Sequence, residues 1–261
     1  MSTANAPALL AIAAAFAAAL TFAAAPAARP GTPVEVQLLP ASAAQPAPTA
    51  APNQVLEALR ERIDAIRASG GEIEAGGETL RATRSLPQLY QMNGFLPLWD
   101  TRRLQSLLGL LKDIEDDGLQ PADYHLALLQ QLISRGGALA PFERATLDLL
   151  ASDAYTLVLY HLYFGKVDPV SLDSRWNFEL RDIGTADAVK YVHDAITGDR
   201  IRASVVQVRP DHWMYAAGRE ILANYRGIAA LGGWPQLPAG PTLKPGMVDP
   251  RVPLLRERLA M

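Results

Sequence analysis

The sequence predicts a mainly α-helical protein whose folded part is one helical bundle over residues 53–240. Apolar residues recur at intervals of three and four along most of this region, which is the period of helices with one buried face. No alternation of strands with helices is present, so no parallel sheet is expected. With 49% hydrophobic and 20% charged residues, the chain can bury one sizeable core.

The N-terminal residues 1–28 predict an export signal or a membrane anchor. Residues 8–28 carry no charge and end in small residues, as an export signal does. Most signals also have a Lys or Arg before the apolar run, and this sequence has none there. An alanine-rich low-complexity tail is the alternative, and cleavage and anchoring both stay open. Residues 29–52 are dominated by Pro and Ala and lack large apolar side chains, so we expect a disordered tether there.

The first predicted helix follows Asn53, a suitable N-cap, and ends at Gly70. Residues 71–84 suggest a small hairpin or an irregular connection, with Gly76 and Gly77 at its tip. A second helix is expected over Thr101–Asp116, with Gly118 in the left-handed conformation after it. The positions expected to face the core of these two helices are Leu56, Leu59, Ile63, Ile66, Leu104, Leu107, Leu108 and Leu111.

A third helix is expected from Pro121, which suits a first helical turn, to Gly136. Its predicted buried face consists of Leu128, Leu129, Leu132 and Ile133. Residues 141–164 follow and become apolar nearly all round, which indicates a helix surrounded by others at the centre of the bundle. A membrane span is disfavoured there because four charged residues precede a short apolar run.

Two further helices are expected, over 185–198 and 211–231. The second of them is lined by Met214, Ile221, Leu222, Tyr225 and Ile228. Residues 241–261 then form a turn and the start of another helix, with Val252, Leu255 and Leu259 on one face. One short helix cannot bury that face alone. We therefore expect a truncated or interrupted reading frame, and the alternative is a short protein whose last helix packs back on the bundle.

Composition and motifs exclude several function classes. The net charge of -3 and the scattered basic residues argue against nucleic acid, and the absence of cysteine removes disulfides and every thiol mechanism. Asp113, Glu115 and Asp117 begin like a calcium loop, but Tyr124 stands where the bidentate Glu is needed, so a solvated helix end is favoured. We therefore predict no catalytic, cofactor-binding or metal-ligating residues in this chain. The histidines, which show no paired spacing, are His125, His161, His193 and His212.

Aromatic residues gather in three places and have two interpretations. Exposed rings could stack on sugars, but packing in the core is the commoner role of large rings and is the interpretation favoured here. The clusters are Tyr90 with Phe95 and Trp99; Tyr155, Tyr160, Tyr163 and Phe164; and Trp176 with Phe178.

Four segments carry a resemblance to a known family. They read GFLPLWD at 94–100, DGLQPADYH at 117–125, YFGKVDP at 163–169 with Trp176 beyond, and YRGIAALGGWPQLPAGPTLKPGMVDPRVPLLRERL at 225–259. Together they resemble the scaffold domain of large periplasmic L,D-transpeptidases running into the first helix of a peptidoglycan-binding repeat. The matching positions, all interpreted as structural, are Trp99, Gly118, Leu119, Pro121, Tyr124, Gly165, Lys166, Asp168, Pro169, Trp176, Gly233, Trp234, Pro235, Pro245, Gly246, Asp249, Arg251, Val252, Leu255 and Arg256.

The resemblance implies a helical body that supports a separate cysteine-dependent catalytic domain in peptidoglycan cross-linking. None of the family's catalytic residues can be carried over, because this chain has no Ser-His-Gly-Cys segment. It implies a periplasmic protein whose partners are peptidoglycan or cell-wall enzymes, with the membrane met only through an uncleaved N-terminal segment. The alternatives are a stand-alone wall-binding or regulatory protein and an enzyme that uses carboxylates on sugars.

Overall fold

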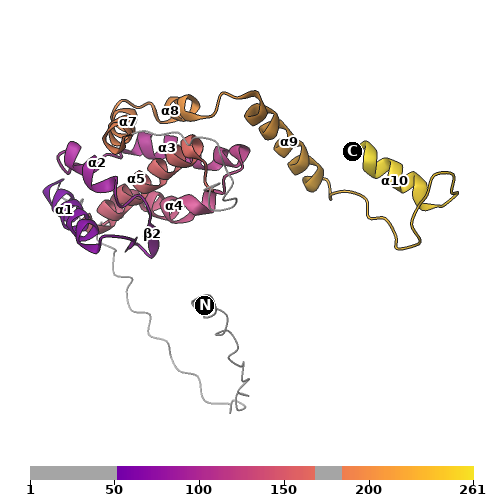
Figure 1. The fold of residues 1–261 in the computed structure, drawn as a ribbon. Helices are drawn as coiled ribbons and strands as arrows, with labels where there is room; N and C mark the ends of the chain where they lie inside the picture. Colours follow the sequence, from indigo (N-terminus) through magenta and orange to yellow (C-terminus); the bar gives the residue numbers. More distant parts are fainter. Residues whose placement is uncertain (1–51, 168–183) are drawn as a thin grey trace, which may run out of the picture. The chain divides into compact units, whose positions relative to one another are not determined.

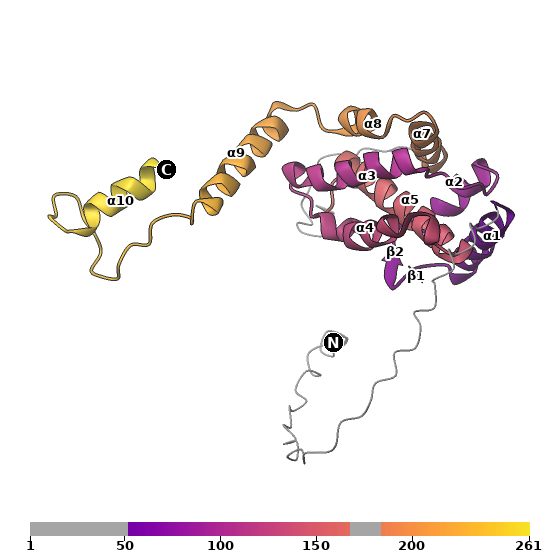
Figure 2. The ribbon, with the colours of Figure 1, turned by 180° about the vertical axis from the view of Figure 1, so that it is seen from behind.

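The predicted mainly helical fold is confirmed by a computed structural model, which describes residues 52–167 and 184–261 (Figures 1 and 2). The chain divides into two units, residues 1–44 and 45–261, and every described residue lies in the second. The predicted export segment, residues 1–28, and nearly all of the predicted tether lie outside the described residues. No described helix has the length and apolar character needed to cross a membrane.

The described elements are helices and one small hairpin. The α-helices are α1 (Pro52–Ser69), α2 (Leu86–Met92), α3 (Thr101–Asp113), α4 (Leu126–Arg135), α5 (Pro141–Phe164), α7 (Thr185–Thr197), α8 (Ile201–Val208), α9 (Trp213–Ala230) and α10 (Arg251–Ala260). The 3₁₀ helices are η1 (Ile114–Asp117), η2 (Pro121–Tyr124) and η3 (Gly136–Ala138), and the strands are β1 (Ile73–Ala75) and β2 (Glu78–Leu80).

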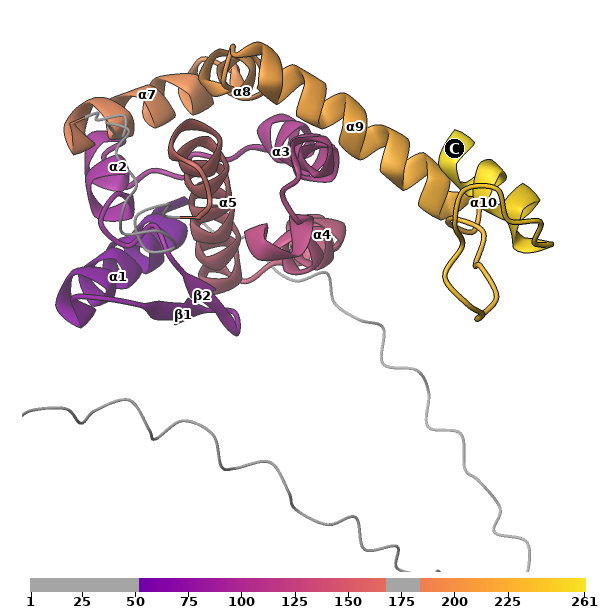
Figure 3. The same cartoon turned by 45° about the vertical axis from the view of Figure 1, so that its right-hand side comes forward.

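Helix α5 is the centre of the bundle, as its all-round apolar character predicted. Helices α1, α2, α3, α4 and α8 all pack on it, and Figure 3 shows α1 and α2 on one side and α3 and α4 on the other. Its middle part, from Ala145 to Tyr155, is buried without interruption. Because no side of this stretch meets water, each polar residue within it needs a partner inside the protein.

The predicted hairpin is present and its tip lies at Gly76 and Gly77, both with positive φ. Strands β1 and β2 pair antiparallel, with Ile73 opposite Leu80. A Cβ at Gly76 would lie 3.1 Å from the Leu128 side chain, so the tip packs closely on the bundle. Glycine thus meets both the backbone and the packing requirement at this position.

The prediction of one helix from Pro121 to Gly136 is wrong. His125 has φ +57°, a left-handed conformation that ends η2 and separates it from α4. The predicted second helix also ends early, at Asp113, and continues as η1, whereas Gly118 adopts the predicted left-handed conformation with φ +77°. Contacts of the His125 side chain, described below, explain the break.

Several local predictions need correction. Helices α2 and α8 were not predicted, because seven or eight residues contain too few turns for a clear periodic pattern. Leu128 and Ile133 on α4 are half-buried, while Leu129 and Leu132 are buried as predicted. Helix α9 spans Trp213–Ala230 and buries none of its residues completely, so the predicted buried lining of that helix is wrong.

Candidate functional site

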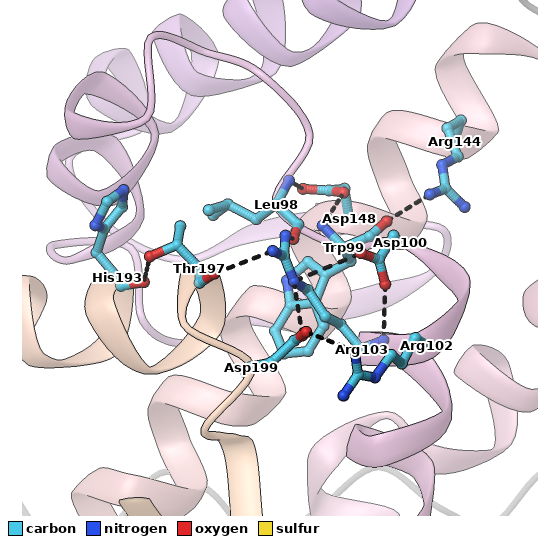
Figure 4. A network of polar contacts seen from close by, with 10 residues as sticks. All are labelled: Leu98, Trp99, Asp100, Arg102, Arg103, Arg144, Asp148, His193, Thr197 and Asp199. Atoms are coloured by element: carbon cyan, nitrogen blue, oxygen red, sulfur yellow. Dashed lines mark hydrogen bonds and ion pairs between the residues drawn. The ribbon is translucent and has the colours of Figure 1, made fainter.

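Asp148 on α5 holds the loop that contains Leu98 and Trp99. Its Oδ1 accepts hydrogen bonds from the Leu98 N–H at 3.0 Å and the Tyr90 hydroxyl at 2.8 Å, and its Oδ2 accepts from the Trp99 N–H at 3.1 Å. One turn on, the Ser152 hydroxyl accepts from the Trp99 indole N–H at 2.9 Å. Figure 4 shows Asp148 directed at these backbone groups. A buried carboxylate saturated with donors fixes a loop in place.

Burial changes the acidity of this cluster. It raises the pKa of Asp148 to about 6, although the hydrogen bonds from Leu98, Tyr90 and Trp99 oppose the rise. Burial and the neighbouring Asp148 charge also raise the pKa of the Tyr90 hydroxyl well above its ordinary value. The Tyr90 hydroxyl therefore stays protonated and available as a donor.

Asp153 holds a second loop from the same helix. Its Oδ1 accepts from the backbone N–H groups of Arg81 at 2.9 Å and Ala82 at 2.7 Å. Its Oδ2 lies 2.9 Å from Nε2 of His125, whose Nδ1 lies 3.3 Å from Oε2 of Glu78. Although burial opposes protonation of His125, its hydrogen bonds and proximity to Asp153 and Glu78 prevail and raise the pKa of the imidazole.

The two motif segments DGLQPADYH and YFGKVDP meet in the fold. Three consecutive residues of the first segment contact the α5 region: Asp123 pairs with Lys166, Tyr124 bonds to His161, and His125 bonds to Asp153. The Tyr124 hydroxyl lies 2.8 Å from Nδ1 of His161. The pKa of His161 is lowered by burial and by the charges of Lys166 and Arg81, so its neutral ring can accept the tyrosine hydrogen.

Arg103 joins three segments at the start of α3. Its guanidinium donates to the Leu98 carbonyl at 2.8 Å, the Thr197 carbonyl at 3.2 Å and the Asp199 carboxylate at 3.2 Å (Figure 4). Asp199 has φ +55°, which turns the chain between α7 and α8. Arg144 on α5 donates to the Trp99 carbonyl at 2.5 Å in the same region. These bonds connect the α2–α3 loop to the α7–α8 turn.

Asp117 at the end of η1 anchors α9. Its carboxylate is completely buried and accepts two bonds from the Arg209 guanidinium, at 3.0 and 2.7 Å. The Tyr215 hydroxyl donates to it at 2.8 Å, and Nε of Arg219 lies 3.0 Å away. The expectation of a solvated helix end is therefore wrong for Asp117, because arginines from beyond α8 cover it.

The calcium-like run forms no metal site within the described part of the chain. Among the described residues, no three or more His, Cys, Asp or Glu side chains converge so that they could hold a metal ion. Asp113, at the start of the calcium-like run, pairs with Arg202 at 2.7 Å. The described carboxylates of this region thus bind arginine and backbone groups.

The positions that match the motifs of the family resemblance fall into three groups in the structure. The first is buried or shapes the bundle: Trp99, Leu119 and Tyr124 are buried, Gly118 and Gly165 have positive φ, Pro121 begins η2, and Lys166 pairs with Asp123. The second group, Asp168, Pro169 and Trp176, lies outside the described residues, as does Phe178.

The third group lies near the C-terminus. Gly233 and Gly246 have positive φ, Trp234 contacts Tyr225, and the Pro235 carbonyl accepts from Arg258. Asp249 accepts three bonds from Arg251, which lower the pKa of its carboxyl to about 2. Pro245 lies in the turn, Val252 and Leu255 are half-buried on α10, and Arg256 is exposed.

The aromatic clusters divide between core and surface. Tyr90, Trp99 and Tyr155 are buried, as the packing interpretation predicted. Tyr160 is 53% exposed, so that interpretation is wrong for this ring. Together with Phe164 it lines an apolar pocket of about 280 Å³ between α2, α5, α7 and α8.

Sequence reasoning did not identify Arg103, Asp148, Ser152 and Asp153. A usable signal existed for three of them, because Asp148, Ser152 and Asp153 are polar residues inside a helix that is otherwise apolar nearly all round. Such residues require internal partners. Their partners lie about 30 to 70 residues away along the chain, so no local pattern names them.

The fold and this network define a helical bundle whose loops and helix ends are held by buried carboxylates, and a protein family described as the Scaffold domain matches residues 84–222. That match covers more than half of the chain, and the protein therefore belongs to the Scaffold domain family. No curated protein and no solved structure matches the sequence. A non-catalytic scaffold role is what the family supports.

Proposed function

We propose that this chain is the non-catalytic scaffold portion of an L,D-transpeptidase that works in peptidoglycan cross-linking in the periplasm. The scaffold role follows from the family, and the link to L,D-transpeptidases rests on the motif segments of the sequence. The 261 residues contain no cysteine, so they supply no thiol nucleophile for acyl transfer.

The observation that supports this function best is how the buried carboxylates are used. Asp148 and Asp153 each accept from two backbone N–H groups, and Asp117 binds two arginines. A catalytic carboxylate must reach a substrate atom, but these three are completely or almost completely buried and already bound to the protein. Their chemistry is that of loop and helix anchors.

The experiment has a negative and a positive arm. Purified chain, incubated with stem-peptide muropeptides, is expected to form no cross-linked product. Added to an L,D-transpeptidase catalytic domain that lacks its own scaffold, it is expected to raise the thermal stability or activity of that domain. Cross-linking by the chain alone would overturn the proposal, and so would release of soluble muropeptides that one Asp or Glu substitution abolishes.

A stand-alone wall-binding protein is the second candidate, and the apolar pocket beside Tyr160 favours it. The Thr156 hydroxyl at this pocket is buried and has no hydrogen-bond partner in the described part of the chain. Retention on intact sacculi that Tyr160→Ala reduces would support this candidate. Unchanged retention in that variant would leave the pocket without a role in wall binding.

A further inference from the structure

Helix α9 presents different residues to η1 and to solvent. The residues that bond to η1 or lie against the adjoining Gly118 are Tyr215, Arg219, Leu222 and Arg226. In a heptad that begins with Met214 at position a, these four residues occupy positions b and f. Positions b and f lie on the side of a helix opposite to a and d. The a/d side of α9 therefore faces away from its anchor.

The a and d positions of α9, together with its C-cap residue Leu231, are apolar over two and a half heptads, with one exception. This α9 open face consists of Met214, Ala217, Ile221, Asn224, Ile228 and Leu231. Met214 is 59% exposed, Ile221 53% and Leu231 84%, so no described helix covers the face. A repeat of this kind is typical of a helix that packs along another helix.

We propose that the α9 open face pairs with the same face of a second copy of this chain, with the two helices parallel and in register. Each a or d residue then meets its own counterpart across the two-fold axis. The inner layers formed by Met214, Ile221, Ile228 and Leu231 bury large apolar side chains that are otherwise wholly or partly in water.

Asn224 determines both the partner and the orientation. Its exposed amide carries donors and an acceptor, so two Asn224 side chains facing each other can hydrogen-bond. In an antiparallel pair that uses the same six residues, a positions face d positions, so Asn224 would lie against Ile221 of the other copy. The Asn224 amide would then be unpaired in an apolar layer. A polar residue at an inner position disfavours every register that leaves it unpaired, and a second copy supplies the matching amide by symmetry.

The flanking positions complement each other in the same register. Parallel helices bring a residue at g beside position e of the next heptad in the partner, five residues further on. Trp213, which is 71% exposed, then lies over Gly218, where a Cβ would meet nothing within 4 Å. Glu220 faces Tyr225, whose hydroxyl can donate to the carboxylate. Glu220 is the one charged residue at the e and g positions from Trp213 to Tyr225, so no like charges oppose the pairing.

Sedimentation equilibrium of the full chain over a range of concentrations tests the pairing. The wild-type chain is expected to dimerise reversibly. Ile221→Glu is expected to weaken the dimer about tenfold or more, because the pairing would bury two like charges. The matched control is Val206→Glu, which changes a residue that is 65% exposed on α8 and should dimerise like the wild type. A monomer at every concentration, or an equal effect of both variants, would overturn the proposal.

Cysteines test the parallel register, since the chain has none of its own. Ala217→Cys alone is expected to give a covalent dimer under oxidising conditions, because position 217 faces itself in the proposed register. In a mixture of Ala217→Cys chains and differently tagged Ile228→Cys chains, disulfides should form within each kind and hardly between the two. The positions lie 11 residues apart, about 16 Å along a helix, which is too far for a disulfide in the parallel pair. A mixed disulfide as the main product would exclude the parallel arrangement.

Discussion

Nε2 of His125 lies 2.9 Å from Oδ2 of Asp153, and both side chains are buried. The other ring nitrogen faces Glu78, so both nitrogens of His125 lie against oxygens that only accept when ionised. The arrangement therefore favours the doubly protonated imidazolium, which carries a positive charge between two carboxylates. His125, the left-handed residue that ends η2, thus links Glu78 on the hairpin to Asp153 on α5.

The stability of the protein should fall as the pH rises through the raised pKa of His125. A group whose pKa is higher in the folded state contributes its full stability below its unfolded value, which is about 6.5 for histidine. That contribution is lost as the pH rises through the folded value. Urea unfolding above about pH 6.5, where the titration of Asp148 is nearly complete, should show a loss of stability that is smaller in His125→Gln than in the wild type.

The control for this pH effect is Gln130→Asn, which changes an exposed residue that does not titrate. Its pH profile of unfolding should follow that of the wild type. If His125→Gln instead preserved the wild-type slope, the positive charge on His125 would not link the hairpin to α5.

Asp148→Asn should destabilise the protein more at low pH than at neutral pH. Burial raises the pKa of Asp148 to about 6, so its protonation adds stability that is complete below about pH 4 and is lost above about pH 6, where the carboxylate keeps its bonds to the loop. Asparagine does not titrate, and its amide nitrogen would meet a backbone N–H. We expect a deficit relative to wild type that is roughly 2 kcal/mol larger at pH 4 than at pH 7. A deficit independent of pH in paired urea titrations would contradict the assignment.

Arg103→Ala should destabilise the bundle by about 2 kcal/mol, because it leaves the Leu98 and Thr197 carbonyls without this donor. Arg102 provides the matched control, since it also pairs with Asp199 but its side chain is 80% exposed. Arg102→Ala should change the free energy of unfolding by less than about 0.5 kcal/mol. Equal effects of the two substitutions in chemical denaturation would show that the backbone contacts of Arg103 add nothing.

Asp117→Asn should release α9 while the bundle stays folded. The substitution leaves Arg209 and Arg219 without the buried carboxylate between them, and breaking such a pair costs about 3 kcal/mol. Hydrogen exchange should accelerate along α9 and stay unchanged in α5. Asp116→Asn is the control, because the Asp116 side chain is 66% exposed. Uniform acceleration in both helices would mean that Asp117 supports the whole bundle instead.

Much of the fold was predictable because its determinants are local. The 3.6-residue period of apolar side chains indicated most of the longer helices, and the all-round apolar stretch identified α5 as central. Gly118 and the pair Gly76–Gly77 marked chain reversals because they occupy conformations with positive φ. The left-handed conformation of His125 could not be predicted, because it depends on bonds to Asp153 and Glu78, which are 28 and 47 residues distant.

The sequence by itself determined the mainly helical class, the central helix and the absence of a thiol nucleophile, since period, burial pattern and composition are carried by the residues alone. The tertiary structure decided which carboxylates became anchors: Asp148 received two backbone donors, Asp153 received two with a histidine, and Asp117 received two arginines. It also decided that α9 turns a mostly apolar face away from η1, because Tyr215, Arg219 and Arg226 on the opposite side bind η1. Both outcomes depend on which distant segments meet, and no local pattern contains that information.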